Sequence, residues 1–219
     1  MKKPGEKKKI TELEKFALEK GAFQVKAFAA QLVAMDERVR AKCQIPRCPH
    51  YGRVLTCPPN VMTLEEFSRV LNRYNTALLV QTSSPISGEA DDYDKEEVLQ
   101  YVAMPGKFKK KGGDKTKLFQ DLDNMKLSAI RLHKLVNEVE SMAMSLGFPY
   151  ALGLIGGDCM LCPECVGISS GEACRRPYQA RPSMEGVGID VLKTSINAGL
   201  PFEMPPKKQI VWSGLVLID

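Results

Sequence analysis

The sequence predicts an α/β fold, a sandwich in which helices pack on a small central sheet of about four strands. Helical and strand-like segments alternate along the 219 residues, the strand-like segments are short and apolar, and one long helix has a broad apolar face. The composition, 44% hydrophobic and 26% charged, excludes a disordered or fibrous chain. We therefore expect residues 10–219 to form a single domain.

The first part of the chain contains helices and strands in alternation. Each predicted helix opens with a capping box, formed by Thr11 with Glu14 and by Thr63 with Glu66. The predicted strands are apolar runs bounded by turn residues or polar residues. The expected helices cover residues 11–20 and 63–74, and the expected strands cover 22–28 and 77–80, with 31–35 extending or following the first strand.

A long helix is the clearest periodic element. Apolar residues recur at spacings of four and three, at Leu118, Leu122, Met125, Ala129, Leu132, Val136, Val139, Ala143 and Leu146. This stripe predicts a helix that ends at Gly147. Such a stripe is also compatible with the coiled-coil seam of a homodimer. Phe119, Ile130, Leu135 and Met142 widen the apolar face, which favours packing against the protein's own sheet.

The last part of the chain completes the alternation. An apolar strand is expected over 150–155, and a helix over 186–198, for which Ser183 is a candidate cap. The β-rich run 209–218 predicts the terminal strand. Between the two halves, residues 83–116 form a polar excursion that we expect to be mobile and to contain at most one helix.

The formal charge of +5 is concentrated in two segments. Residues 1–9 contribute +4 and residues 107–117 contribute +5, so the rest of the chain is net acidic. These lysines would suit a nucleic acid, but no RNA-binding aromatic motif or helix-turn-helix pattern accompanies them. We interpret them as a disordered basic tail over 1–9 and a mobile loop, and we expect no nucleic-acid partner.

The sequence gives no indication of a membrane protein. No apolar run has the length of a membrane span, and the basic amino end has no apolar segment behind it. A cytoplasmic protein is therefore expected. In a reducing compartment, seven cysteines without a secretion signal are poor material for a disulfide framework.

The cysteines fall in two loops, 43–60 and 156–182, and the second loop carries the stronger motif. Cys159, Cys162 and Cys165 follow one another at two-residue spacing, and Cys174 comes eight residues later. Three thiols at this spacing can surround a compact inorganic core that a fourth completes, as in loops that bind a [4Fe–4S] cluster. Zinc, which more often uses two separated pairs of ligands, is the alternative, and unliganded core thiols are another.

The first loop has a weaker motif. Cys43, Cys48 and Cys57 could bind a second [4Fe–4S] cluster, share one larger site with the other four cysteines, or be buried small hydrophobic residues. Three thiolates would leave one iron of a cluster without a cysteine ligand. Water, His50, Tyr51 or a substrate could then bind that iron.

Several side chains near the cysteines are candidates for contact with the cofactor or with an anionic substrate. Arg175, Arg176 and Arg181 follow Cys174, and Tyr51 lies between two cysteines of the first loop. Guanidinium groups would stabilise a reduced cluster or bind a carboxylate or phosphate. The simpler interpretation is that the arginines lie on the surface. His133, within the long helix, is expected to be structural.

Two stretches of the sequence resemble a known family. Residues 36–60 (DERVRAKCQIPRCPHYGRVLTCPPN) and residues 156–191, which contain GGDCMLCPEC and CRRPYQARPSMEGVGIDV, resemble the "predicted metal-binding protein" family found mainly in anaerobes. The resemblance covers nearly the whole chain. It implies an iron–sulfur-type metal protein with the metal positions on the seven cysteines. It implies no particular reaction.

Three hypotheses about function follow. The first is an oxygen-sensitive iron–sulfur protein with two clusters, which exchanges electrons with a redox partner protein. Its clusters should lie near each other and near the surface, with no enclosed pocket. The second is an enzyme that uses the open iron for reductive or sulfur-transfer chemistry on a small anionic substrate, with a pocket beside Cys57 lined by Tyr51 and arginines. The third is a zinc-stapled interaction module whose lysines bind an acidic partner.

Overall fold

The structure, a computed structural model, describes residues 4–45, 48–86, 116–204 and 206–219. An antiparallel sheet of four strands forms its centre, in the order β1-β2-β4-β3. The strands are β1 (Gln24–Ala29), β2 (Thr76–Pro85), β3 (Leu152–Ile155) and β4 (Gln209–Ile218). The predicted α/β fold with a sheet of about four strands is therefore confirmed.

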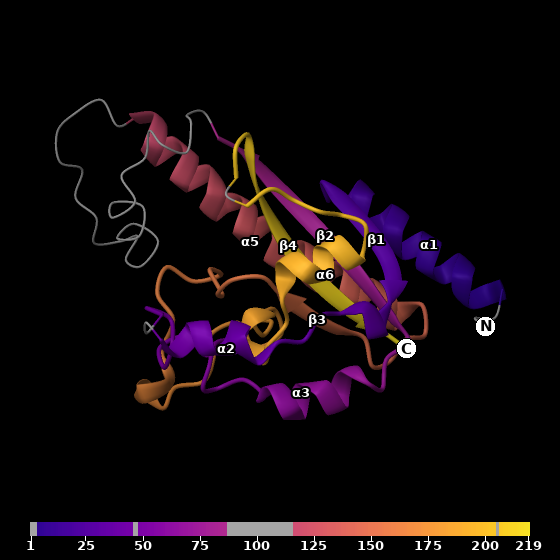
Figure 1. Cartoon of the computed structure of the whole chain (residues 1–219), viewed down its shortest axis with the longest axis horizontal. Helices are drawn as coiled ribbons and strands as arrows, with labels where there is room; N and C mark the ends of the chain where they lie inside the picture. Colours follow the sequence, from indigo (N-terminus) through magenta and orange to yellow (C-terminus); the bar gives the residue numbers. More distant parts are fainter. Residues whose placement is uncertain (1–3, 46–47, 87–115, 205) are drawn as a thin grey trace.

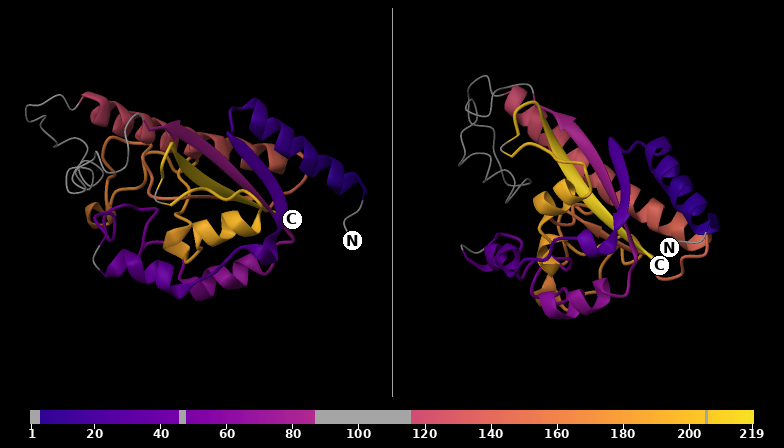
Figure 2. Two further views of the ribbon diagram at one scale, coloured as in Figure 1. Left: turned by 45° about the horizontal axis from the view of Figure 1, so that its top comes forward. Right: turned by 45° about the vertical axis from the view of Figure 1, so that its right-hand side comes forward.

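Helices cover both faces of this sheet. Helices α1 and α5 lie on one face and α3 and α6 on the other (Figures 1 and 2). The α-helices are α1 (Pro4–Glu19), α2 (Glu37–Gln44), α3 (Leu64–Leu71), α5 (Thr116–Ser145) and α6 (Val191–Asn197). Short 3₁₀ helices are η1 (Ala30–Leu32), η3 (Ile168–Ser170) and η4 (Glu185–Val187). Among the described residues, no helix is both long and apolar enough to cross a membrane.

The hydrophobic core has two layers because the central strands are buried on both faces. On β2, Leu78 and Val80 pack in the layer under α1 and α5, while Ala77 and Leu79 pack in the layer under α3. Successive residues of a strand point to opposite faces, so a strand covered on both sides reads as a continuous apolar run. This is why the short run 77–80 was recognisable in the sequence as a buried strand.

Helix α5 approaches the sheet closely at Val136. Gly153 of β3 and Gly214 of β4 lie opposite this side chain, and a Cβ atom at position 153 would lie 2.8 Å from Val136 Cγ1. A Cβ atom at position 214 would also collide with Val136. Val136 is fully buried, and the side chain of Leu132 is only 1% exposed. The apolar stripe of α5 therefore packs on the protein's own sheet, as its width predicted.

The amino-terminal prediction was wrong. Helix α1 begins at Pro4, so residues 4–9 are helical rather than part of a disordered tail, and the helix does not start with a capping box at Thr11. The Thr11 hydroxyl instead donates a hydrogen bond to the Lys7 carbonyl within the helix (3.1 Å). Proline suits the first position of a helix because its missing N–H is not needed there. Residues 1–3 lie outside the described residues.

Other boundaries also differ from the predictions. Strand β2 continues to Pro85, so the excursion begins later than residue 83, and residues 87–115, with most of the second lysine segment, lie outside the described residues. The helix expected over 186–198 begins only at Val191, with Asp190 as its cap. Ser183 instead accepts the Gly186 N–H of η4 (3.1 Å). Helix α2 was not predicted; its cap is the Asp36 side chain, and none of its residues is buried. It contains Cys43, so the expectation that this cysteine lies in the first loop was wrong.

Candidate metal centres

The second cysteine loop begins and ends on strand β3. Beyond Ile155 the chain leaves the sheet, and it returns alongside the same residue at Pro182. The Ile155 N–H donates to the Pro182 carbonyl (3.0 Å), and the Met184 N–H donates to the Ile155 carbonyl (2.8 Å). Both ends of the 156–182 loop are thus held at one point of the sheet edge.

The first cysteine loop is attached to the same place. The Ser183 N–H donates to the carbonyl of Thr56 (3.0 Å), one residue before Cys57. At its other end, Arg40 of α2 donates hydrogen bonds to the carbonyls of Met62 and Gly186. These contacts bring two loops that are far apart in the sequence against each other.

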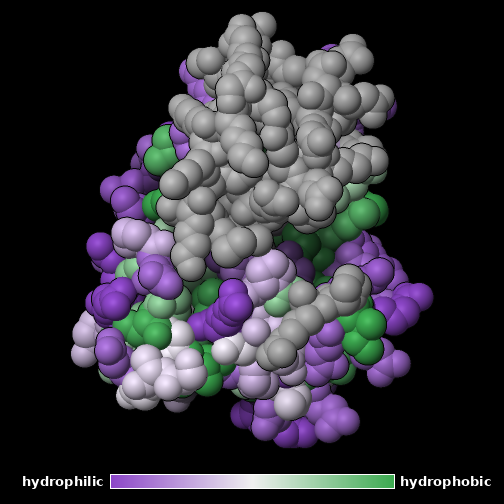
Figure 3. Space-filling view, turned by 90° about the vertical axis from the view of Figure 1, so that its left-hand side faces the viewer, coloured by the Kyte–Doolittle hydropathy of each residue, from purple (hydrophilic) through white to green (hydrophobic). Residues whose placement is uncertain are grey.

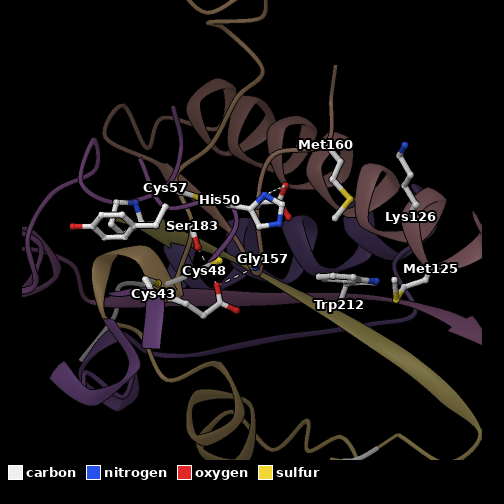
Figure 4. A pocket seen from close by; sticks show the side chains of 14 residues that line it. Cys43, Cys48, His50, Cys57, Met125, Lys126, Gly157, Met160, Ser183 and Trp212 are labelled. Carbon is white, nitrogen blue, oxygen red and sulfur yellow. Dashed lines mark hydrogen bonds and ion pairs between the residues drawn. The ribbon is translucent and has the colours of Figure 1, made fainter. Parts of the chain in front are cut away.

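The three cysteines of the first loop line one cavity of about 310 Å³. In Figure 4 the labelled cysteines gather at one end of this cavity, Trp212, Met125 and Lys126 lie at the other end, and His50 lies between them. The lining residues are Cys43, Cys48, His50, Tyr51, Cys57, Pro58, Met125, Lys126, Gly157, Asp158, Met160, Ser183, Glu185 and Trp212. The cavity thus combines three thiols with a mostly apolar far end.

Two carboxyl groups face this cavity. His50 Nδ1 lies 3.5 Å from Asp158 Oδ2, and these side chains are 20% and 14% exposed. Glu185 Oε2 accepts hydrogen bonds from the Gly157 N–H (2.9 Å) and from the Ser183 hydroxyl (3.1 Å). Burial raises the pKa of both Asp158 and Glu185, and the neighbouring His50 opposes the rise at Asp158.

Two thiols of this cavity, those of Cys43 and Cys57, have raised pKa values. Burial raises the pKa of Cys57 far above its usual range, and the charge of Asp158 adds to the effect. Burial also raises the pKa of Cys43, with a contribution from Cys48. Metal ligation requires thiolates, so metal binding here must displace protons.

The four cysteines of the second loop line a separate, narrow pocket of about 20 Å³, together with Val54, Leu55, Thr56, Leu161, Val166, Arg175, Arg176 and Ala180. The Arg176 N–H donates to the Cys174 sulfur (3.4 Å). Burial raises the pKa of the Cys159 thiol to about 11. Backbone N–H groups that point at cysteine sulfur are among the features that tune iron–sulfur clusters.

Each pocket contains one buried polar group without a hydrogen-bond partner among the described residues. Thr56 Oγ1 has none beside the four cysteines, and Trp212 Nε1 has none in the three-cysteine cavity. Unsatisfied buried donors are costly, and they call for a partner such as an ion or another bound group. A cofactor with acceptor atoms, such as the sulfides of a cluster, fits the Thr56 hydroxyl.

The described side chains do not form a ready-made site for a single ion. No group of three or more His, Cys, Asp or Glu side chains in the described part of the chain is arranged so that it could hold one metal ion. A zinc ion needs its thiolates to converge to about 2.3 Å from one point. The cysteines instead line two pockets, three of them in one and four in the other.

Three of the four residues predicted to contact the cofactor or a substrate line a pocket, and the fourth does not. Tyr51 lines the three-cysteine cavity, while Arg175 and Arg176 line the four-cysteine pocket. Arg181 lines neither of them. Its guanidinium is paired with Glu140 of α5 and donates to Asn137 Oδ1 (2.9 Å), so it attaches the end of the loop to α5.

His133 is structural, as its position in the long helix indicated. It is 1% exposed, and its Nε2 accepts the backbone N–H of Arg181 (2.9 Å). Burial, assisted by the charge of Arg181, lowers the pKa of His133 to about 4. It therefore binds the loop in its neutral form.

Sequence reasoning gave no role to several residues of the cavity. Asp158, Glu185, Lys126 and Trp212 come from four different segments, and only the fold brings them together. The one available signal was position: Asp158 directly precedes Cys159, and Glu185 follows the arginine segment after Cys174.

Figure 3 shows the side of the molecule on which α2 and the cysteine loops lie in Figure 1. In the part drawn in colour, hydrophobic and hydrophilic residues are interspersed.

The family model of the "Predicted metal-binding protein (DUF2284)" matches residues 26–218, a range that includes both loops and every strand except the first two residues of β1. The chain belongs to this family. No curated protein and no solved structure matches the chain. Membership supports metal binding as the property of this site.

Proposed function

We propose that the protein binds two iron–sulfur clusters of the [4Fe–4S] type and acts in electron transfer or low-potential redox chemistry. Cys159, Cys162, Cys165 and Cys174 would hold one cluster, and Cys43, Cys48 and Cys57 the other. The observation that carries the proposal is the division of seven thiols between two adjoining pockets, four in one and three in the other. A bound cluster would supply one-electron chemistry, and the chain positions and shields it.

The arrangement of the donors supports clusters over zinc. The thiols line two pockets, and among the described residues they form no group of three or more that could hold a single ion, which a zinc site would require. The Arg176 N–H bonded to Cys174 sulfur and the unpartnered Thr56 hydroxyl are donors of the kind that stabilise anionic sulfur. If the protein instead binds zinc or cobalt, and its cysteine loops rearrange when it does so, the zinc-stapled module is supported.

The proximity of the two pockets supports electron transfer between them. Thr56 lines one pocket and Cys57, the next residue, lines the other. In the same way, Asp158 lines the three-cysteine cavity and Cys159 the four-cysteine pocket. Consecutive Cα atoms are about 3.8 Å apart. The two pockets are therefore adjacent at two places in the chain, where one residue lines one pocket and the next residue lines the other.

The surface beside the four-cysteine pocket supports a redox partner that is acidic. Arg175 and Arg176 are exposed there, and Tyr178 is 88% exposed. Exposed guanidinium groups attract an acidic protein surface and accelerate its association at low salt. A small anionic substrate would be attracted by the same charges.

The cavity favours a second candidate function, an enzyme that uses the open iron. It lies beside Cys57 and includes Tyr51, as that hypothesis predicted, and its far end could hold a small ligand against Trp212 and Met160. The predicted arginines do not line the cavity. Among its lining residues, the lysine or arginine is Lys126. Reductive or sulfur-transfer chemistry on a small molecule would take place there.

Metal and sulfide analysis of anaerobically purified and reconstituted protein tests the proposal. We expect about eight iron and eight sulfide per chain, and an EPR signal after reduction. Cys162→Ser and Cys48→Ser should each lower the iron content by up to about half, and each should remove a different EPR component. Stoichiometric zinc without sulfide would refute the proposal. A spectrum that shifts when cyanide or a thiol is added would favour the enzyme.

A further inference from the structure

We propose that His50 ligates the fourth iron of the three-cysteine cluster through Nε2, with Asp158 as the residue that orients the imidazole ring. This inference rests on the proposed function, because it requires a cluster on Cys43, Cys48 and Cys57. It assigns the one coordination position for which the loop provides no thiol.

The contact between His50 and Asp158 has the form found at metal-bound histidines. Such a histidine almost always donates the N–H of its other ring nitrogen to a carboxylate or carbonyl, which fixes the tautomer and the ring orientation. Here Nδ1 lies 3.5 Å from Asp158 Oδ2, which is an ion-pair distance between the same two kinds of atom, and both side chains are largely buried. With the proton on Nδ1, Nε2 carries the lone pair that a metal needs.

The position of His50 suits this role. It lies two residues after Cys48, in the same loop as Cys48 and Cys57, while Cys43 lies in α2, and its side chain lines the cavity that all three cysteines line. Figure 4 shows its ring between the cysteine end of the cavity and the Trp212 end. Its Nε2 makes no hydrogen bond with any residue in the described part of the chain.

The other candidate donors each take part in hydrogen bonds within the protein. Glu185 Oε2 already accepts two hydrogen bonds, from the Gly157 N–H and the Ser183 hydroxyl, which hold that carboxylate in the loop framework. The Tyr51 hydroxyl accepts a hydrogen bond from Gln44 Nε2 (3.1 Å). His50 is therefore the candidate whose Nδ1 is paired with a carboxylate while its side chain lines the cavity.

The test uses the fact that the chain has only two histidines. Protein labelled with ¹⁵N-histidine is reconstituted, reduced and studied by pulsed EPR, where a directly coordinated nitrogen gives a strong hyperfine coupling. We expect this coupling in the wild type. It should persist in His133→Gln, because His133 lines neither pocket, and it should be lost in His50→Gln.

Two further variants give independent readouts. His50→Cys supplies a fourth thiolate, so the cluster should form without nitrogen coupling and its midpoint potential should become more negative, because replacing histidine by a negatively charged thiolate favours the oxidised state. Asp158→Asn should keep the ring in place but accelerate iron loss to a chelator by about 10- to 100-fold. His50→Gln should yield a three-iron cluster signal after mild oxidation.

The failure of this inference can be distinguished from the failure of the proposed function. Two clusters with full iron and sulfide, but without strong nitrogen coupling in the wild type, would overturn the histidine ligand and leave the two-cluster proposal intact. If the cluster signal is lost in Glu185→Gln but unchanged in His50→Gln, the fourth coordination position belongs to the Glu185 carboxylate instead. Zinc without sulfide would overturn both.

Discussion

The ion pair between Arg181 and Glu140 is predicted to hold the end of the second cysteine loop on helix α5. The two side chains are 15% and 7% exposed, and Arg181 also donates to the Asn137 side chain. Breaking a buried ion pair by removing one partner costs about 3–5 kcal/mol, because a charge is left without compensation. Glu140→Gln leaves a neutral acceptor and the carbonyls of Tyr178 and Ala180, so we expect a loss near the lower limit, about 3 kcal/mol.

The chain offers a matched control two residues away. Glu138 lies on the same helix and pairs with Lys20 at 3.8 Å, but both side chains are about half exposed. Glu138→Gln should therefore cost less than about 1 kcal/mol. Urea unfolding followed by circular dichroism, with both variants in the same metal state, measures the difference. At about 2–4 °C per kcal/mol, Glu140→Gln should also lower Tm by about 6–12 °C.

The same experiment reports on the metal centre. Because Arg181 lies at the end of the 156–182 loop, a loosened loop should release its bound metal to a chelator faster in Glu140→Gln than in Glu138→Gln. If the two variants unfold at the same urea concentration, the pair does not hold the loop and the reasoning fails. If stability falls but metal release is unchanged, the pair supports the core and not the metal site.

Two further predictions concern the helix that supports the site. Burial lowers the pKa of His133 to about 4, so between the ordinary value of 6.5 and about pH 4 the unfolded chain binds a proton that the folded chain does not. Unfolding free energy should then fall with decreasing pH by up to about 1.4 kcal/mol per unit, and His133→Gln should flatten this part of the profile; superimposable profiles would contradict it. Gly214→Ala should cost about 1–3 kcal/mol because its methyl group meets Val136. Val136→Ala in the same chain should restore part of that loss, and strictly additive losses in denaturant titrations would show that the two side chains do not meet.

The elements that could be predicted from the sequence are those whose local pattern agrees with the core. The capping box at Thr63 is present, with Glu66 bonded back to the Thr63 N–H (2.8 Å). The same pattern at Thr11 failed because Ile10 and Leu13, both residues of α1, are buried in the core, so the apolar face of the helix continues upstream of Thr11. Packing of a whole helix face outweighs a local capping signal of about 1 kcal/mol.

The candidate site could be predicted only in part. Cysteine spacing within each loop is local information, and it gave the two groups of thiols that now line two pockets. The pairing of His50 with Asp158 and the approach of Lys126 are long-range, because they depend on how the chain returns to the edge of β3. No periodicity or motif in one sequence encodes such a contact.

Asp158 connects the two centres, and this determines how they assemble. It directly precedes Cys159 of one site and pairs with His50 of the other, while Ser183 ties the end of the second loop to Thr56 in the first. Each loop also provides residues that line the pocket of the other. The two sites should therefore form cooperatively on the edge of β3, and a variant that disorders either loop should weaken metal binding at both.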